Sequence, residues 1–241
     1  MVTLKMAIIF LMEQIRTPFS LIWTIMSPTV LFFFLHFNEI ELHYGDTAWL
    51  GKQISWFVGY ISFSVVLFNY CLYLVGRRES GFIATFVHNM DGRLLFIRSQ
   101  LIASLIMSIL YVFFFILVVL TGFQASPDYQ IVMIILKSIY INAFMMVSLT
   151  FIASFRVTFQ TASTIYSVLI TVCMVSGIVS LKYNEGIVYW INQVNPIAIY
   201  STILQSDQEL SLMTIFFYSI MLIISIISAL TFKTEPVWSS Q

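Results

Sequence analysis

The sequence GRRESGFIATFVHNMDGRLLFIR, residues 76–98, holds four of the eleven Lys and Arg residues of this chain and lies between two long apolar runs. Each of the two runs is long enough to cross a bilayer. A positively charged loop between two such runs is typical of the cytoplasmic side of a membrane protein. We therefore place this stretch inside the cell and count the other segments outward from it.

The apolar residues inside this loop have helical spacing. Phe82 and Phe86 are one turn apart, and an aliphatic residue follows each of them, which makes a short apolar stripe. Asp91-Gly92 then indicates a turn. We expect a short helix beneath the membrane. Two roles are possible for this stretch. As a solvated loop it would only fix the topology of the chain, and as a docking helix it would bind a cytoplasmic partner.

The composition of the chain excludes a soluble domain. Of its 241 residues, 60% are hydrophobic and 9% are charged, whereas roughly a quarter of the residues of a soluble domain are charged. The bilayer must therefore be its main solvent. The formal net charge is +0, which gives no electrostatic reason to expect nucleic acid. Cys71 and Cys173 lie inside apolar runs, which argues against a disulfide framework.

Six apolar segments predict an all-α polytopic membrane protein. The predicted spans are 18–37, 54–75, 99–121, 131–154, 159–181 and 211–232. Eight of the eleven basic residues then fall inside: Lys5, Arg16, Arg77, Arg78, Arg93, Arg98, Arg156 and Lys233. Three fall outside: Lys52, Lys137 and Lys182. This bias predicts that both termini are cytoplasmic.

The N-terminal residues 3–16 are apolar but short. Lys5, Glu13 and Arg16 fall within one arc at 100° per residue, which is typical of a helix lying in the inner membrane interface. A cleavable signal peptide is the alternative. It is disfavoured because Glu13 and Arg16 follow the apolar core directly and no small-x-small cleavage site is present.

The segment between the first two predicted spans is polar. His36, Glu39, Glu41 and His43 are residue types that bind metals. Their close spacing in a polar loop favours solvated side chains, so we predict no metal site there.

Lys137 and Asn142 lie inside the fourth predicted span. Lys137 is about two turns inside, and we expect its ammonium group to reach the outer interface; contact with a substrate is the alternative. Asn142 is deeper, and we expect it to form a helix–helix hydrogen bond. In the third span, Ser104 and Ser108 are one turn apart and favour close approach of a neighbouring helix.

Residues 187–200, IVYWINQVNPIAIY, are apolar and aromatic but contain several polar residues and a proline. The run is too short to span a bilayer. Trp190 suits a membrane interface. We expect a re-entrant or surface helix on the outer side, ending at Asn195-Pro196.

Motifs of catalysis and nucleotide binding are absent from the sequence. The only Gly-Lys pair, Gly51-Lys52, is followed by Gln53 and does not form a phosphate-binding loop. Neither a Gly-x-Ser-x-Gly elbow nor a His-Glu-x-x-His helix occurs. No predicted span carries a pair of carboxylates, which argues against a proton-coupled carrier. We therefore do not expect the chain to be an enzyme by itself.

These features together resemble the permease subunits of ABC-2 type exporters. The interfacial helix ends in Arg16-Thr17-Pro18. The second span is followed by Arg78-Glu79-Ser80-Gly81, which is similar to the family's Arg-Glu-x-Gly entry to its coupling helix. Six spans and Asn195-Pro196 before the last span complete the likeness. One departure is that residues 82–87 are mainly apolar, where many members carry more Lys and Arg.

The resemblance implies a bacterial cell-membrane protein that pairs with a second permease copy or a paralogous permease. Two separate ATPase subunits would bind ATP and Mg²⁺, so this chain would hold no cofactor. Residues 77–89 would sit in a groove on each ATPase, with Glu79 in the first turn of the coupling helix. The residues expected to couple the two are Arg77, Arg78, Glu79, Gly81, Phe82 and Phe86.

Two other functions stay open: a secondary carrier or channel that works alone, and a membrane scaffold or immunity protein. The predicted spans are rich in Phe, Ile and Met, which suits hydrophobic or amphipathic cargo. A hydrophobic peptide or toxin, such as a bacteriocin or phenol-soluble modulin, is the first expectation. Drugs and lipid-linked glycans come next.

Overall fold

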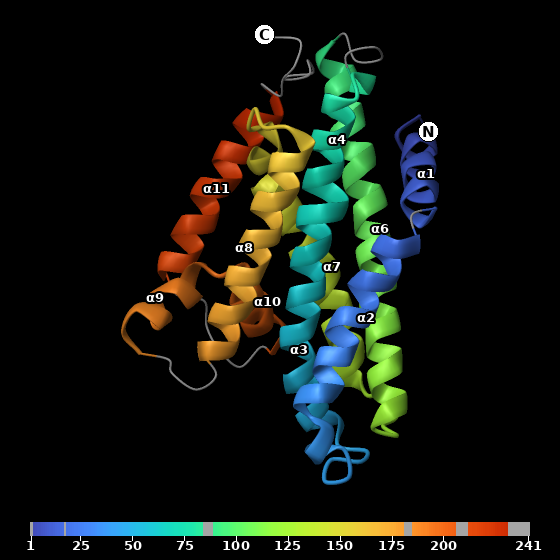
Figure 1. The fold of residues 1–241 in the computed structure, drawn as a ribbon, viewed down its shortest axis with the longest axis vertical. Helices are drawn as coiled ribbons and strands as arrows, with labels where there is room; N and C mark the ends of the chain where they lie inside the picture. The colour runs from blue at the N-terminus through green and yellow to red at the C-terminus, as the bar shows by residue number, and fades with distance from the viewer. Residues whose placement is uncertain (1, 17, 84–88, 181–184, 206–211, 231–241) are drawn as a thin grey trace.

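The computed structural model describes residues 2–16, 18–83, 89–180, 185–205 and 212–230, and no strand occurs in these ranges. The helices form one elongated bundle (Figure 1). In chain order they are α1 (Val2–Ile15), α2 (Pro18–Leu35), the short η1 (Phe37–Glu39), α3 (Thr47–Ser64), η2 (Val65–Leu72), α4 (Tyr73–Glu79), α6 (Met90–Gly122), α7 (Tyr129–Ser154), α8 (Phe159–Ser180), α9 (Gly186–Val194), α10 (Pro196–Gln205) and α11 (Leu212–Leu230).

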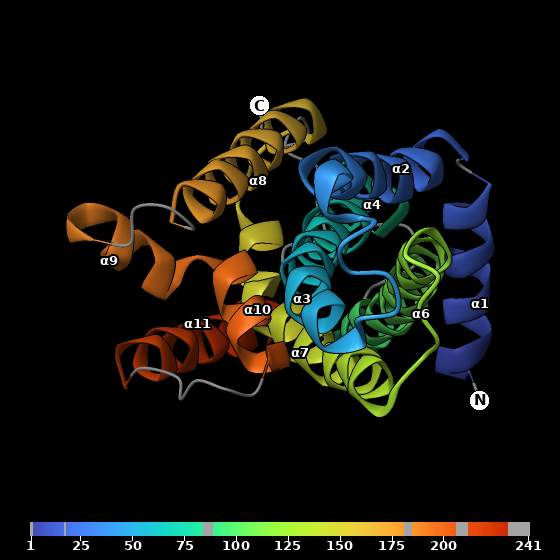
Figure 2. The same ribbon diagram turned by 90° about the horizontal axis from the view of Figure 1, so that it is seen from below.

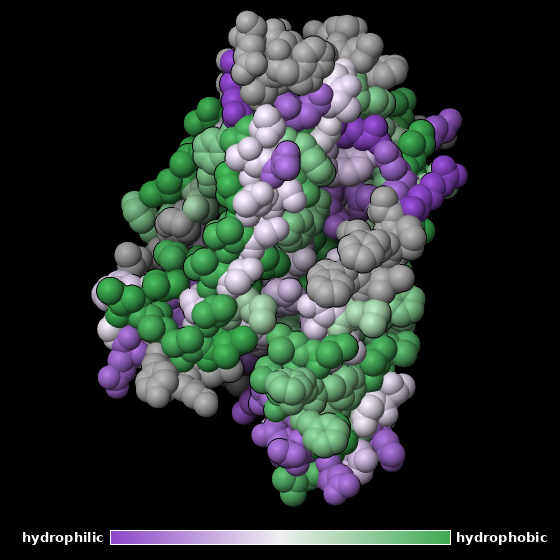
Figure 3. Space-filling view, viewed as in Figure 1, coloured by the Kyte–Doolittle hydropathy of each residue, from purple (hydrophilic) through white to green (hydrophobic). Residues whose placement is uncertain are grey.

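Four of these helices are apolar and long enough to cross a membrane. They are Thr47–Glu79, which joins α3, η2 and α4, and Met90–Gly122, Tyr129–Ser154 and Phe159–Val179. On the face shown in Figure 3, hydrophilic residues gather toward the two ends and hydrophobic residues cover most of the middle. The chain is therefore a multi-pass helical membrane protein.

The first and last predicted spans correspond to α2 and α11. Their shorter described apolar stretches are Thr24–Leu35 and Tyr218–Leu230. Pro28 lies inside α2, where a proline removes one backbone hydrogen bond of the helix. Six complete membrane crossings stay a prediction.

Helix α3 begins at Thr47, seven residues before the predicted start of the second span. Asp46 caps it, because its side chain accepts a hydrogen bond from the backbone N–H of Trp49 at 3.0 Å. That bond, followed by the contact with His43, lowers the pKa of the Asp46 carboxyl below its usual range. Lys52 is consequently on a helix rather than in a loop.

Helix α6 begins at Met90 and not at residue 99. The predicted turn at Asp91-Gly92 is wrong, since both residues are in the first turn of α6. Asn89 caps this helix through a 2.8 Å bond from the Gly92 N–H to its side-chain oxygen. Asp91 contributes a carboxylate near the positive end of the helix dipole. These caps explain why the helix forms where the sequence shows polar residues.

The core lies where α3, α6 and α7 pack together, and Figure 2 shows these helices close to end-on. Helix α10 packs tightly on α3 at Gly59, where a Cβ would lie 2.8 Å from Tyr200 Cβ. Asn142 joins three helices. It donates to Ser108 Oγ at 2.6 Å and accepts from Tyr200 Oη at 2.6 Å. The predicted helix–helix hydrogen bond at Asn142 is confirmed.

Candidate functional site

The Arg-Glu-x-Gly sequence ends a helix in this structure. The N–H of Ser80 donates to Gly76 O at 2.9 Å, and the N–H of Gly81 donates to Arg78 O at 3.1 Å. Gly81 has a φ of +74°, the left-handed conformation that terminates many helices. Glu79 is the last residue of α4. The expectation that Glu79 opens the next helix is therefore wrong.

Arg77 ties the end of α4 to α1. Its guanidinium group contacts the Glu13 carboxylate and donates to Tyr73 Oη at 2.8 Å. The same group lies over the Phe82 ring, 4.7 Å from its centroid, and 5.0 Å from that of Tyr73. Tyr73 also donates to Glu13. One carboxylate on α1 is thus held by two side chains of α4.

Phe82 is half-buried against this cluster, and Ile83 is fully buried in the core. In a docking helix, a cytoplasmic partner would cover the aromatic residues of this loop. For Phe82 the chain itself supplies part of the cover. Phe86, the second aromatic residue of that prediction, lies outside the described residues.

Arg78 is buried, with 1% of its surface exposed, and it contacts a different part of the bundle from Arg77. Its guanidinium group donates to three backbone carbonyls: Ala153 O at 3.2 Å, Phe155 O at 3.0 Å and Val157 O at 2.8 Å. These carbonyls belong to the end of α7 and the turn into α8. Glu79 lies 3.7 Å from Arg78 Nε. Arg78 therefore holds the α7–α8 turn against α4.

Helix α1 runs across the bundle, since Figure 2 shows it from the side while α3, α6 and α7 are seen near their ends. Lys5 and Arg16 are exposed, whereas Glu13 is turned toward Arg77. Its exposed face is otherwise apolar and includes Leu4 and Ile9, each 58% exposed. That this helix lies in the inner membrane interface stays a prediction.

A polar cluster at the centre of the bundle was not foreseen from the sequence. Asn69 lies in the π-helical η2, and its backbone carbonyl accepts three side-chain donors. They are Gln100 Nε2 at 2.7 Å, Ser104 Oγ at 3.0 Å and Gln14 Nε2 at 3.4 Å. A π-helix frees backbone groups from the regular ladder and occurs frequently at functional sites. Gln14 inside an apolar run is the signal that sequence reasoning could have used.

Asn195-Pro196 is the junction between α9 and α10. Asn195 is buried, and its side-chain amide donates to Cys173 O at 2.9 Å and to Ser176 Oγ at 3.1 Å, both on α8. Its Oδ1 accepts the N–H of Ile197 at 3.0 Å, which caps α10. Trp190 on α9 is 58% exposed. The segment is thus two short helices, of which α10 enters the core.

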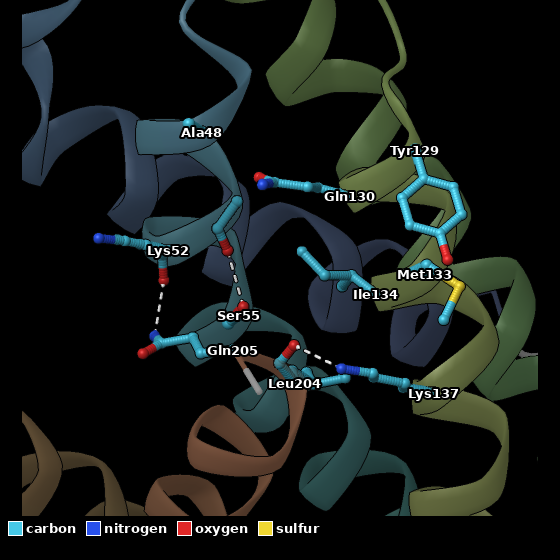
Figure 4. A pocket seen from close by; sticks show the side chains of 11 residues that line it. Ala48, Lys52, Ser55, Tyr129, Gln130, Met133, Ile134, Lys137, Leu204 and Gln205 are labelled. Atoms are coloured by element: carbon cyan, nitrogen blue, oxygen red, sulfur yellow. Dashed lines mark hydrogen bonds between the residues drawn. The ribbon is translucent and has the colours of Figure 1, made fainter. Parts of the chain in front are cut away.

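A cavity of about 560 Å³ lies at the end of the bundle opposite to Arg77 and Arg78 (Figure 4). It lies where α3 and α7 begin and α10 ends. Its lining residues are Ala48, Gly51, Lys52, Ser55, Tyr129, Gln130, Met133, Ile134, Lys137, Leu204 and Gln205. Lys137 reaches its floor and donates to Leu204 O at 3.5 Å.

The histidines of the polar loop pair separately. His36 Nδ1 lies 2.6 Å from Glu39 Oε2, and His43 Nδ1 lies 3.2 Å from Asp46 Oδ2. Within the described ranges, no group of three His, Cys, Asp or Glu side chains has the geometry of a metal site.

A search of protein-family models found none that matches the chain.

Proposed function

We propose that this chain is the membrane subunit of an ATP-driven exporter, with ATP hydrolysed by two separate subunits that dock at its inner end. The observation that carries the proposal is the pair of arginines before Gly81. Arg77 holds α1 and Arg78 holds the α7–α8 turn. A partner acting on the adjoining segment would therefore act on three parts of the bundle together.

The mechanism that follows is mechanical coupling. Closure of the ATPases would displace residues 82–89, which follow directly on the end of α4. Because the Arg78 guanidinium bonds three carbonyls in a buried site, the α7–α8 turn would move with α4. Coupling through packed and hydrogen-bonded elements requires two discrete arrangements of the bundle. The π-helical η2 supports this, since a local change of helical register there would let α3 and α4 move separately.

A second copy of the permease, or a paralogue, would cover the polar side of α8. Gln160, Thr164, Ser167 and Thr171 are exposed and lie on one face of that helix. A pale stripe follows α8 in Figure 3. Small hydroxyl residues on a membrane helix favour close packing of another helix. This face supports the expected pairing of two membrane subunits.

The proposed setting is a bacterial cell membrane crossed six times, with both termini and residues 82–89 in the cytoplasm. The proposed cargo is hydrophobic or amphipathic, with a peptide or toxin first and a drug or lipid-linked glycan next. The apolar hollow beside α7 and α11, lined by Phe144, Met145 and Ile215 among others, supports a hydrophobic group on the cargo but does not select a peptide.

The test is purification of the tagged chain from its native host in a mild detergent. We expect a soluble ATPase to co-purify, and Phe82→Ala to weaken its retention severalfold. Phe37→Ala is the control, since Phe37 is 72% exposed at the other end of the bundle. ATP-independent flux in vesicles of the isolated chain would support a carrier instead. Neither activity would support a scaffold or immunity protein.

A further inference from the structure

One face of α7 borders two hollows. Gln130, Met133, Ile134 and Lys137 line the cavity of Figure 4. The next turns of the same face line a second hollow of about 420 Å³ between α7, α10 and α11. Its lining residues are Tyr140, Ile141, Phe144, Met145, Ile199, Ile203, Ile215, Tyr218 and Ser219. Both volumes are within the range of about 300–1,000 Å³ that is usual for small-molecule sites.

Lys137 is the last residue of α7 that lines the first cavity, and Tyr140, about one turn later, is the first that lines the second hollow. Lys137 is half-buried, and its ammonium group has three donors, one of which makes a long 3.5 Å bond to Leu204 O. Leu204 is in the last turn of α10, where the helix dipole favours a cation. Figure 4 shows that the Lys52 side chain points away from the cavity, although its backbone lines it.

The first cavity is consequently positive. Among the described residues that line it there is no acidic side chain, and Lys137 is the cation that points into it. An anionic group placed there would replace the weak bond to Leu204 O with a charge-assisted one. Such bonds are roughly twice as strong as neutral hydrogen bonds.

We propose that the two hollows bind a single-chain anionic amphiphile, with its carboxylate on Lys137 and its acyl chain along α7, α10 and α11. The second hollow favours an acyl chain over a peptide. Ile, Phe and Met side chains make up most of its lining, and the backbone groups of the helices behind them are bonded within those helices. A peptide backbone would bury amides without partners there, whereas an acyl chain brings no polar group.

This inference does not depend on the export proposal. A fatty-acid site on the outer half of the bundle would serve a carrier, a scaffold or an exporter equally. Its success or failure is therefore measured separately from binding of an ATPase.

The experiment is equilibrium binding of palmitate, carrying a photoactivatable diazirine in its chain, to the purified protein in an uncharged detergent. We expect the acid to bind about tenfold more tightly than its methyl ester. Lys137→Gln should abolish that preference and Lys137→Arg should retain it. Lys52→Gln is the matched control and should leave it unchanged. Light-induced cross-links should map to α7, α10 and α11.

Asp207 and Glu209 require a second control, because they follow Gln205 closely and lie outside the described residues. We expect the Asp207→Asn, Glu209→Gln chain to keep the wild-type preference for the acid. A large gain in palmitate affinity in this variant would show that the chain's own carboxylates occupy Lys137 and would overturn the proposal.

Three further results would contradict the proposal. The first is equal binding of acid and ester by the wild-type chain. The second is unchanged binding by Lys137→Gln at a wild-type melting temperature, which shows that the variant is folded. The third is displacement of palmitate by an amphipathic peptide with a free C-terminal carboxylate at lower concentration than by unlabelled palmitate, which would assign the hollows to peptides.

Discussion

Replacing Arg78 with methionine tests the buried contact between α4 and the α7–α8 turn. The substitution keeps the length of the side chain but removes a guanidinium group that is 1% exposed and bonds three carbonyls at 2.8–3.2 Å. A hydrogen bond to a charged group contributes about 1.5–3 kcal/mol. The net stabilisation of the fold by Arg78 is smaller than the sum of three such bonds, because burying the guanidinium charge itself costs free energy. Phe155 O also keeps its bond from the Val157 N–H.

We therefore expect Arg78→Met to lower the free energy of unfolding by about 3–5 kcal/mol, the usual result of removing one partner from a buried charged cluster. Arg78→Lys restores the charge but not the fork of donors, and we expect a loss of roughly half as much. The assay is reversible unfolding in mixed micelles with increasing SDS, followed by circular dichroism. Arg98→Met, at an exposed arginine, should stay within about 0.5 kcal/mol of wild type. The reasoning is refuted if Arg78→Met lies within 1 kcal/mol of the Arg98 control.

Three further predictions concern other contacts. Glu13→Gln and Arg77→Gln in a double-mutant cycle should give a coupling of about 0.5–1 kcal/mol in the same unfolding assay, and independent effects would contradict the contact between α1 and α4. Gly59→Ala should lower the free energy of unfolding by about 1–3 kcal/mol, because the new Cβ would meet α10. Gly51→Ala should be tolerated, because its new Cβ would lie 3.6 Å from the nearest atom. A cysteine replacing Asn89, in a background without the native cysteines, should react with an impermeant reagent only after the membrane is opened. Labelling of this cysteine in intact cells would show that the predicted orientation in the membrane is inverted.

The positions of α7 and α8 could be predicted closely from the sequence. The predicted span 131–154 corresponds to α7, Tyr129–Ser154, and the span 159–181 corresponds to α8, Phe159–Ser180. The reason is local. A segment in lipid must be apolar over its whole length and must satisfy its own backbone hydrogen bonds, so hydropathy and length define a helix without knowledge of its neighbours.

The helix starts at Thr47 and Met90 could not be found in this way. Lys52 and Arg93 are charged, and hydropathy does not distinguish a loop from a helix that continues beyond the apolar region. The signals that decide both starts are the caps, Asp46 and Asn89, each of which accepts a backbone N–H three residues later. Capping residues at these positions are a sequence feature, but polar loops contain many such residues, so the signal is weak until the bond is seen.

The partners of the polar residues were the least predictable part. Gln14 and Asn69 are 55 residues apart in the sequence, and Arg78 reaches carbonyls 75 to 79 residues away. A backbone carbonyl leaves no trace in the sequence, because every residue has one. The sequence therefore indicates that a buried polar side chain needs a partner, but it does not indicate which helix supplies it.

The adjacent arginines show how a short motif can serve two elements. Successive residues on a helix point about 100° apart, so Arg77 and Arg78 cannot face the same neighbour. Arg77 contacts a carboxylate on α1, where its side chain stays partly exposed. Arg78 is enclosed, donates to three carbonyls, and lies 3.7 Å from Glu79. The contact with α1 is a partly exposed ion pair, whereas the contact with the α7–α8 turn is a set of buried hydrogen bonds. We therefore expect the attachment at the α7–α8 turn to be the more rigid of the two. A displacement of the segment after Gly81 would thus be carried mainly by α7 and α8, while α1 adjusts along the surface of the bundle.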